Sequence, residues 1–190
     1  MSNLQFLSPV ERFLLMLLAA PGNQSKGHEP VKGKTWLQKE MFFISQNVGD
    51  LNELAGFENY RYGAYSEVIE DVLDQLITDR YVEVETGKIQ LSGKGVPFAR
   101  QLWESATKEE KDIVQEIKAL LNDMTNDELL GFSYSAYPDM KQNSDFAKIL
   151  EKEKFKIALS LLRKGKVSRE KAAEIAGQPL ARFLAEANKS

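Results

Sequence analysis

Hydrophobic and polar positions follow a helical period over much of the chain. Apolar residues recur at three- and four-residue spacing in six segments of the first 134 residues, 8–20, 35–46, 66–78, 96–105, 108–123 and 125–134. This spacing is typical of helices with one buried face. Ser8-Pro9-Val10-Glu11 supplies an N-cap, a first-turn proline and a capping-box glutamate, and Pro21-Gly22 ends that helix. After Asn47 the pattern is compatible with a turn and a short helix through Leu51, Leu54 and Ala55.

The period changes from helical to alternating after residue 80. Tyr81 to Glu85 alternates like a strand, Thr86-Gly87-Lys88 is a turn, and Ile89 to Leu91 alternates again. Three helices followed by a two-stranded hairpin is the order of a winged helix-turn-helix. Because so small a hairpin is not stable alone, we expect it to pack on the helices.

The last part of the chain reads as a separate helical unit. A helix over 155–164 ends at Gly165, Ser168 begins a helix that runs to Gly177, and Pro179 begins another. A turn glycine between two short helices, preceded by alanines that permit close crossing, is the spacing of a helix-turn-helix. Many small helical hairpins share this spacing, so it does not by itself establish the class.

We therefore predict a mainly α protein with a small two-stranded β-hairpin, organised as a winged helix-turn-helix plus a C-terminal helical unit. The expected domains are a winged-helix-like domain over 1–105, a helical extension over 106–140 and a basic helix-turn-helix-like unit over 146–190. Residues 141–145 are the expected linker.

Short strings in both halves of the chain are typical of known families. Gly33-Lys34-Thr35-Trp36-Leu37-Gln38-Lys39, Tyr62-Gly63-Ala64-Tyr65-Ser66 and Leu91-Ser92-Gly93-Lys94-Gly95 occur in that order. Together they resemble motifs of a prokaryotic winged-helix-like family close to the SocA-like or Panacea group, whose members act as antitoxin or proteolytic-adaptor domains. The resemblance covers residues 8–105, and Ala64 stands where that family commonly has proline.

A second resemblance lies in the C-terminal unit. Gly165-Lys166-Val167-Ser168, Lys171-Ala172-Ala173-Glu174 and Ala176-Gly177 resemble the core pattern of a small helical family found in antitoxin-like proteins. A fusion of both families implies an antitoxin or a transcription regulator, and identifies no target.

Charge is distributed unevenly along the chain. The total is 25 basic against 28 acidic residues, a net charge of −3. Residues 101–150 hold 5 basic and 10 acidic residues, whereas residues 151–190 hold 10 basic and 5 acidic ones. An acidic body with a basic C-terminal piece predicts two kinds of partner surface.

Composition excludes much catalytic and metal chemistry. The chain has no cysteine and one histidine, His28, which lies in a polar loop and reads as a bystander. Gly33-Lys34-Thr35 ends like a phosphate loop, but no earlier glycine or preceding strand completes that motif. Adjacent carboxylates such as Glu70 and Asp71 point in different directions on a helix, so they do not form a pair that could hold a metal ion. We expect no enzyme activity, no cofactor and no metal site.

Targeting signals are not evident in the N-terminal pattern. The apolar run 14–20 is too short to span a bilayer, and no positively charged segment precedes it. We expect a cytoplasmic protein that does not bind a membrane.

The basic C-terminal unit is the candidate DNA-binding site. Its candidate contacts to phosphates and base edges are Lys164, Lys166, Ser168, Arg169, Lys171, Gln178 and Arg182. The alternative is that this basic face pairs with the acidic residues of 101–150.

The third helix of the N-terminal domain carries the opposite charge. Residues 67–80 contain five carboxylates and one basic residue, Arg80. Repulsion between these carboxylates and DNA phosphates therefore opposes docking of this helix in a DNA groove. We predict that the domain binds a partner protein or dimerises, through residues Tyr62, Tyr65, Glu67, Glu70 and Asp74. A solvated acidic face and core packing of the tyrosines are the alternatives.

These observations favour a non-enzymatic, antitoxin-like regulator. It would bind a partner protein, such as a toxin encoded nearby, through its N-terminal domain and DNA through its C-terminal unit. The alternative is a stand-alone, dimeric DNA-binding transcription regulator.

Overall fold

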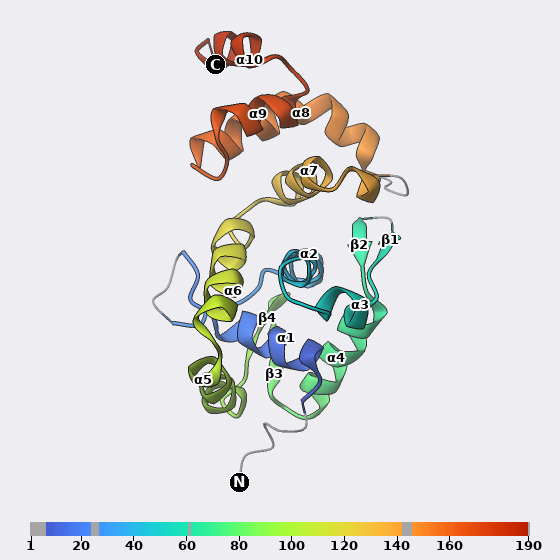
Figure 1. Ribbon diagram of the computed structural model, residues 1–190, viewed down its shortest axis with the longest axis vertical. Coiled ribbons are helices and arrows are strands. Elements are labelled where there is room, and N and C mark those ends of the chain that lie inside the picture. The colour runs from blue at the N-terminus through green and yellow to red at the C-terminus, as the bar shows by residue number, and fades with distance from the viewer. Residues whose placement is uncertain (1–6, 24–26, 61, 142–145, 190) are drawn as a thin grey trace. The chain divides into compact units, whose positions relative to one another are not determined.

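The computed structural model describes residues 7–23, 27–60, 62–141 and 146–189 (Figure 1). It is mainly helical with two small two-stranded sheets, so the predicted fold class is confirmed. The chain divides into two compact units. The N-terminal unit comprises Met1–Glu58 and Ala64–Asp123, and the C-terminal unit comprises Asn59–Gly63 and Met124–Ser190.

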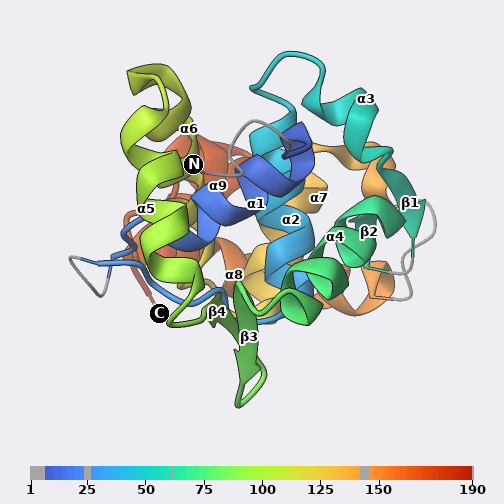
Figure 2. The same ribbon diagram turned by 90° about the horizontal axis from the view of Figure 1, so that it is seen from below.

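Six helices and one hairpin build the N-terminal unit within the described residues. They are α1 (Pro9–Ala19), α2 (Lys34–Ser45), α3 (Leu51–Ala55), α4 (Glu67–Thr78), β3 (Val82–Glu85), β4 (Lys88–Leu91), α5 (Gly95–Ser105) and α6 (Lys108–Leu121). Helix α1 lies at the centre of this unit and contacts the other five helices and β4 (Figure 2). Leu14, Leu15 and Leu17 are fully buried, because α1 is apolar on nearly all sides and must be enclosed.

The hairpin packs on these helices through one face of its strands. Val82 lies opposite Leu91 in the antiparallel register, and both are buried. Val31, between α1 and α2, exchanges two backbone hydrogen bonds with Ile89, each 2.9 Å from nitrogen to oxygen. The hairpin β3–β4 follows α4 and precedes α5, as the sequence predicted, and the winged-helix assignment stays a prediction.

A second pair of strands was not expected from the sequence. Strands β1 (Glu58–Tyr60) and β2 (Gly63–Tyr65) pair with each other just before α4, where the sequence pattern predicted no strand. Each strand has three residues, and all three of β1 are exposed. So short a segment, without a buried face, has no alternating pattern that could reveal it.

The C-terminal unit contains four α-helices and a 3-10 turn among its described residues. They are α7 (Asn126–Ala136), η2 (Pro138–Lys141), α8 (Ala147–Arg163), α9 (Arg169–Ala176) and α10 (Leu180–Ala187). Helix α9 packs against α7, α8 and α10. Helix α8 begins at Ala147 rather than at the expected Phe155, and its added first turns bury Leu150. Of the expected linker, Lys141 ends η2 and residues 142–145 lie outside the described residues.

The expected extension over 106–140 is divided between the two units. Helix α6 belongs to the N-terminal unit, where its Lys118 hydrogen-bonds backbone carbonyls at the end of α1. Helix α7 belongs to the C-terminal unit, where its Glu128 contacts Ser160 and Lys164 of the α8 region. No helix in the described part of the chain is both long enough and apolar enough to cross a membrane.

Candidate functional site

The C-terminal unit places two glycine turns where the sequence predicted them. Gly165 follows α8 with φ 67°, and Gly177 ends α9 with φ 66°, so both adopt the left-handed conformation that favours glycine. Ser168 is the N-cap of α9, and its hydroxyl accepts a hydrogen bond of 3.1 Å from the Lys171 amide. Because Ser168 caps the helix, part of its hydrogen-bonding capacity is already used.

Most of the predicted DNA-binding side chains have partners within the unit. The ion pairs are Lys164–Glu128 at 2.6 Å, Lys171–Glu174 at 2.7 Å and Arg182–Glu186 at 3.0 Å. Gln178 also donates a hydrogen bond to Glu186, at 3.1 Å, and Lys166 likewise has an interaction partner. Arg169 is exposed and forms no hydrogen bond or ion pair with a described residue.

Three further exposed cations lie on a helix of the C-terminal unit. Lys148, Lys152 and Arg163 lie on α8 and form no hydrogen bond or ion pair with a described residue. At the helical period they occupy one face, within about 60° of the helix circumference. Sequence reasoning missed the two lysines because it started α8 too late. The four-residue spacing of Lys148 and Lys152 was the available signal.

The structure divides the predicted partner-binding residues between the two units. Tyr62 belongs to the C-terminal unit, where its ring stacks on Phe146 with centroids 4.9 Å apart. Tyr65 is half-buried at the end of β2 in the N-terminal unit. Glu67 and Asp74 are exposed on α4. Glu70 instead forms an ion pair with Lys34 and accepts a 3.2 Å hydrogen bond from Gln38.

The exposed face of α4 is acidic, as the sequence predicted. Asp71 lies between Glu67 and Asp74 on this face, at four- and three-residue spacing, and is also exposed. Val68, which is 39% exposed, is an apolar side chain on the same helix. In the hairpin, Glu83 and Glu85 are exposed, and the Gln90 amide donates to both. We call Glu67, Val68, Asp71 and Asp74 the acidic face of α4.

The N-terminal unit buries charged side chains that the sequence gave no reason to expect. Lys39 donates to the Ala64 carbonyl at 2.8 Å, and its burial lowers its pKa to about 7. Glu40 is fully buried with both carboxylate oxygens unpartnered, and burial raises its pKa to about 8. Lys118 donates to the carbonyls of Leu17 and Ala20, and burial lowers its pKa to about 8. Both lysines satisfy backbone carbonyls, which is a structural role.

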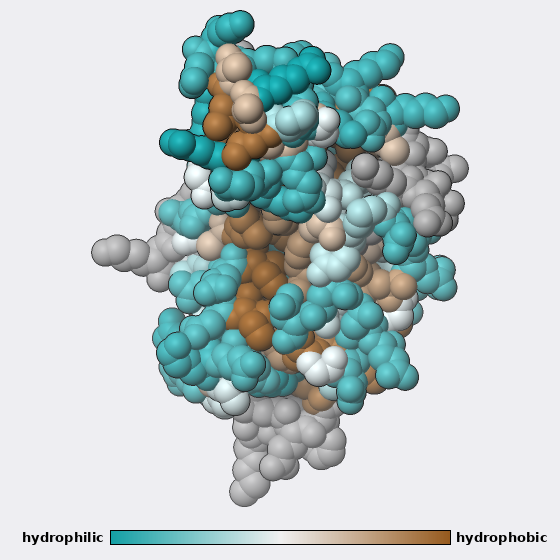
Figure 3. Space-filling model, turned by 45° about the horizontal axis from the view of Figure 1, so that its top comes forward, coloured by the Kyte–Doolittle hydropathy of each residue, from teal (hydrophilic) through white to brown (hydrophobic). Residues whose placement is uncertain are grey.

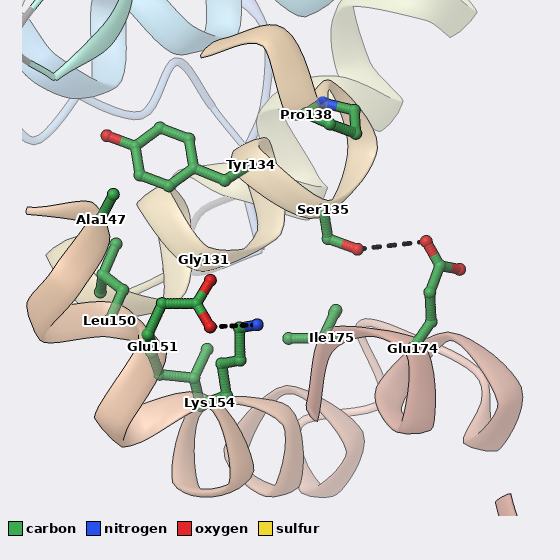
Figure 4. A pocket seen from close by; sticks show the side chains of 11 residues that line it. Gly131, Tyr134, Ser135, Pro138, Ala147, Leu150, Glu151, Lys154, Glu174 and Ile175 are labelled. Atoms are coloured by element: carbon green, nitrogen blue, oxygen red, sulfur yellow. Dashed lines mark hydrogen bonds and ion pairs between the residues drawn. The ribbon is translucent and has the colours of Figure 1, made fainter. Parts of the chain in front are cut away.

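A cavity of about 200 Å³ lies inside the C-terminal unit, between α7, η2, α8 and α9 (Figure 4). Tyr134, Leu150 and Ile175 give it an apolar lining. The polar side chains around it pair with one another or with close neighbours. Ser135 donates to Glu174 at 3.3 Å, and Lys154 forms an ion pair with Glu151. Because these charges are compensated, we assign no ligand to this cavity.

Comparisons with family models, with curated proteins and with solved structures find no match. In the part of the chain that the structure describes, no three or more His, Cys, Asp or Glu side chains form a group that could hold a metal ion. The geometry therefore defines a mainly helical protein of two units, one with an acidic helix face and one with exposed cations. The family resemblances stay predictions.

Proposed function

We propose that this chain is a non-enzymatic, antitoxin-like regulator that binds DNA through its C-terminal unit and a partner protein through its N-terminal unit. The observation that carries the proposal is a set of exposed cations on α8 and at the start of α9 that form no ion pair with a described residue, namely Lys148, Lys152, Arg163 and Arg169. Figure 3 shows hydrophilic side chains over most of the end of the molecule that holds α10, beside a smaller hydrophobic group.

Phosphate binding needs cations that can leave their present surroundings at low cost. Arg163 and Arg169 flank the turn between α8 and α9 and meet this condition without losing an ion pair. Lys171 and Arg182 can exchange an exposed carboxylate for a phosphate, since exposed ion pairs contribute only about 0–1 kcal/mol. Lys164 cannot do so as cheaply, because its partner Glu128 is only 4% exposed.

DNA binding is tested by fluorescence anisotropy of a labelled duplex from the gene's own upstream region, over a series of salt concentrations. The double variant Arg163→Gln/Arg169→Gln is expected to weaken binding at least about tenfold and to flatten the log–log salt dependence by about 2, because two phosphate contacts are lost. Sequence preference over a random duplex would support a regulator that acts on its own promoter.

The matched control is Lys88→Gln/Lys108→Gln, which removes two exposed charges from the N-terminal unit. It lowers the net charge by the same amount, and we expect it to leave the salt slope unchanged. An equal loss in both double variants would show that only net charge matters. Absence of binding by the wild-type chain at low salt would eliminate the DNA-binding part of the proposal.

Protein binding through the acidic face of α4 rests on charge and on exposed apolar surface. Carboxylates around Val68 suit a partner whose basic side chains surround an apolar contact. The same carboxylates would face phosphates unfavourably, so this helix is a poor DNA reader. The stand-alone transcription regulator, which needs no such partner, is the alternative function.

The partner test uses co-expression with the product of an adjacent reading frame, followed by titration of the purified pair. We expect Glu67→Gln/Asp74→Asn to weaken the complex about tenfold, because both exposed charges face the partner. Glu104→Gln/Glu109→Gln, which alters exposed carboxylates of α5 and α6, should leave it unchanged. If no adjacent product binds, the stand-alone regulator is favoured. If both variant pairs bind as the wild type does, α4 is not the interface.

A further inference from the structure

The N-terminal unit contains a cavity of about 300 Å³ that the proposed function does not use. It lies between the end of α1, the loop residues Pro21, Gly27 and His28, the end of β4, and α5. Pro21, Leu91 and Val96 contribute apolar lining. Its volume reaches the lower end of the range of pockets that bind small molecules, about 300–1,000 Å³.

The polar side chains that line this cavity are His28, Arg100 and Trp103. An imidazole, a guanidinium and an indole can all donate hydrogen bonds. None of the three side chains forms a hydrogen bond or an ion pair with a described residue. No carboxylate belongs to the lining among the residues that the structure describes, although the first hundred residues contain 13 acidic side chains against 10 basic ones.

The uncompensated cation distinguishes this cavity from the one in the C-terminal unit. There, Lys154 already has a carboxylate partner at Glu151. Here, Arg100 is exposed and forms no ion pair with a described residue, and its planar guanidinium is suited to bidentate contact with a carboxylate. Trp103 lies three residues further along α5, so its indole and the guanidinium share one side of that helix.

We infer that this cavity binds a small aromatic carboxylate, with its carboxylate at Arg100 and His28 and its ring against Trp103 and the apolar wall. The ring gains from burial and from aromatic contact, and the carboxylate gains charge-assisted hydrogen bonds from two exposed side chains that pair with no described residue. His28, which reads as a bystander in the sequence, becomes a ligand contact. This inference does not depend on the proposed DNA or protein binding.

The test is a titration of the full chain, labelled with ¹⁵N, with phenylacetate as the probe. The chain has two tryptophans, Trp36 and Trp103, so two indole N–H resonances are expected, and Trp36→Phe assigns them. We expect a saturable shift of the Trp103 resonance and little shift of Trp36. In Arg100→Gln, the dissociation constant should rise at least about tenfold, since a hydrogen-bonded charge pair is lost.

Two controls make the result specific. Lys88→Gln removes an exposed charge from the same unit outside the cavity, and it should bind phenylacetate as the wild type does. Phenylacetamide keeps the ring without the charge, and it should bind at least about tenfold more weakly than phenylacetate. Absence of a saturable Trp103 shift at millimolar phenylacetate would overturn the inference. Equal binding of the amide, or an unaffected Arg100→Gln variant, would equally overturn it.

Discussion

Replacing Lys118 with methionine is expected to destabilise the N-terminal unit by about 3 kcal/mol, because the buried Leu17 carbonyl loses its donor and the Ala20 carbonyl keeps only the 3.4 Å hydrogen bond from the Glu29 amide. The Lys118 ammonium donates to the carbonyls of Leu17, at 2.7 Å, and Ala20, at 2.9 Å. In a continuing helix, the amide four residues after Leu17 would satisfy that carbonyl. Position 21 is proline and has no amide hydrogen, so the lysine takes over this role.

Glu40 provides the contrasting variant to Lys118→Met. Its carboxyl group is fully buried without a hydrogen-bond partner, so Glu40→Gln removes an ionisable group without breaking a bond. Burial raises the pKa of Glu40 to about 8. The unfolded chain releases this proton near pH 4.5, whereas the folded chain keeps it until about pH 8, so Glu40 lowers stability progressively as the pH rises between these values. The free energy of unfolding that Glu40→Gln gains over the wild type should therefore grow by about 2–4 kcal/mol between pH 5 and pH 8.

Tryptophan fluorescence during chemical denaturation measures both variants. Trp36 and Trp103, the two tryptophans of the chain, lie in the N-terminal unit, so the signal reports on that unit. Lys108→Met is the control for Lys118→Met, because it removes a charge from the same helix at a side chain that is 90% exposed. A Lys118→Met midpoint equal to that of Lys108→Met would show that the buried ammonium contributes nothing. A Glu40→Gln gain that is independent of pH would contradict the raised pKa.

Local signals in the sequence predicted the helices well. The predicted Ser8 capping box is formed, and Ser66 and Thr125, the first residues of the predicted helices 66–78 and 125–134, are the N-caps of α4 and α7. They could be predicted because each depends on residues only three positions apart. The start of α8 was misplaced because its first turns carry Lys148, Ile149 and Lys152, of which Ile149 is 56% exposed. An exposed apolar residue among lysines does not follow the pattern of one buried face.

The candidate sites could be predicted only in part, since pairing depends on residues distant in sequence. The acidic face of α4 follows from composition at helical spacing, and the structure exposes it. The count of basic residues over 151–190 could not show that Lys164 pairs with Glu128, 36 residues away. Burial of Lys39, Glu40 and Lys118 depends in the same way on which helices pack together. Without knowledge of that packing, a charged residue in a helix indicates a position exposed to solvent.

Replacing Glu128 with alanine is expected to destabilise the C-terminal unit by about 3 kcal/mol, because the variant loses a buried carboxylate that joins the start of α7 to the end of α8. Glu128 is 4% exposed and completes the capping box of α7 with Thr125. Its other contacts are the Ser160 hydroxyl at 2.5 Å and the Lys164 ammonium at 2.6 Å. Glu128→Gln keeps a side chain that can accept a hydrogen bond from Ser160, but it loses the ion pair with Lys164. Its free energy of unfolding should therefore lie between those of the wild type and Glu128→Ala.

The pH dependence of this effect has a defined direction. Burial by itself raises the pKa of Glu128, but hydrogen bonds from Lys164, Ser160 and the Thr125 amide outweigh burial and place the pKa below its ordinary value. The carboxylate therefore stabilises the fold fully above about pH 4.5, and this contribution is lost as the pH falls through the lower folded-state pKa. The difference between the wild type and Glu128→Ala should shrink on acidification.

Hydrogen exchange resolved by peptide is the measurement that locates the Glu128 effect. Glu128→Ala should speed exchange in α7, α8 and α9 through easier local opening, while α1 and α2 of the N-terminal unit keep their protection. Asp127→Ala is the matched control, because it removes an exposed carboxylate from the same first turn of α7. If Asp127→Ala speeds exchange as much as Glu128→Ala, the effect comes from the charge at the helix N-terminus rather than from the buried contacts. Faster exchange confined to the first turn of α7 would show that Glu128 acts as a cap and does not hold α7 against α8.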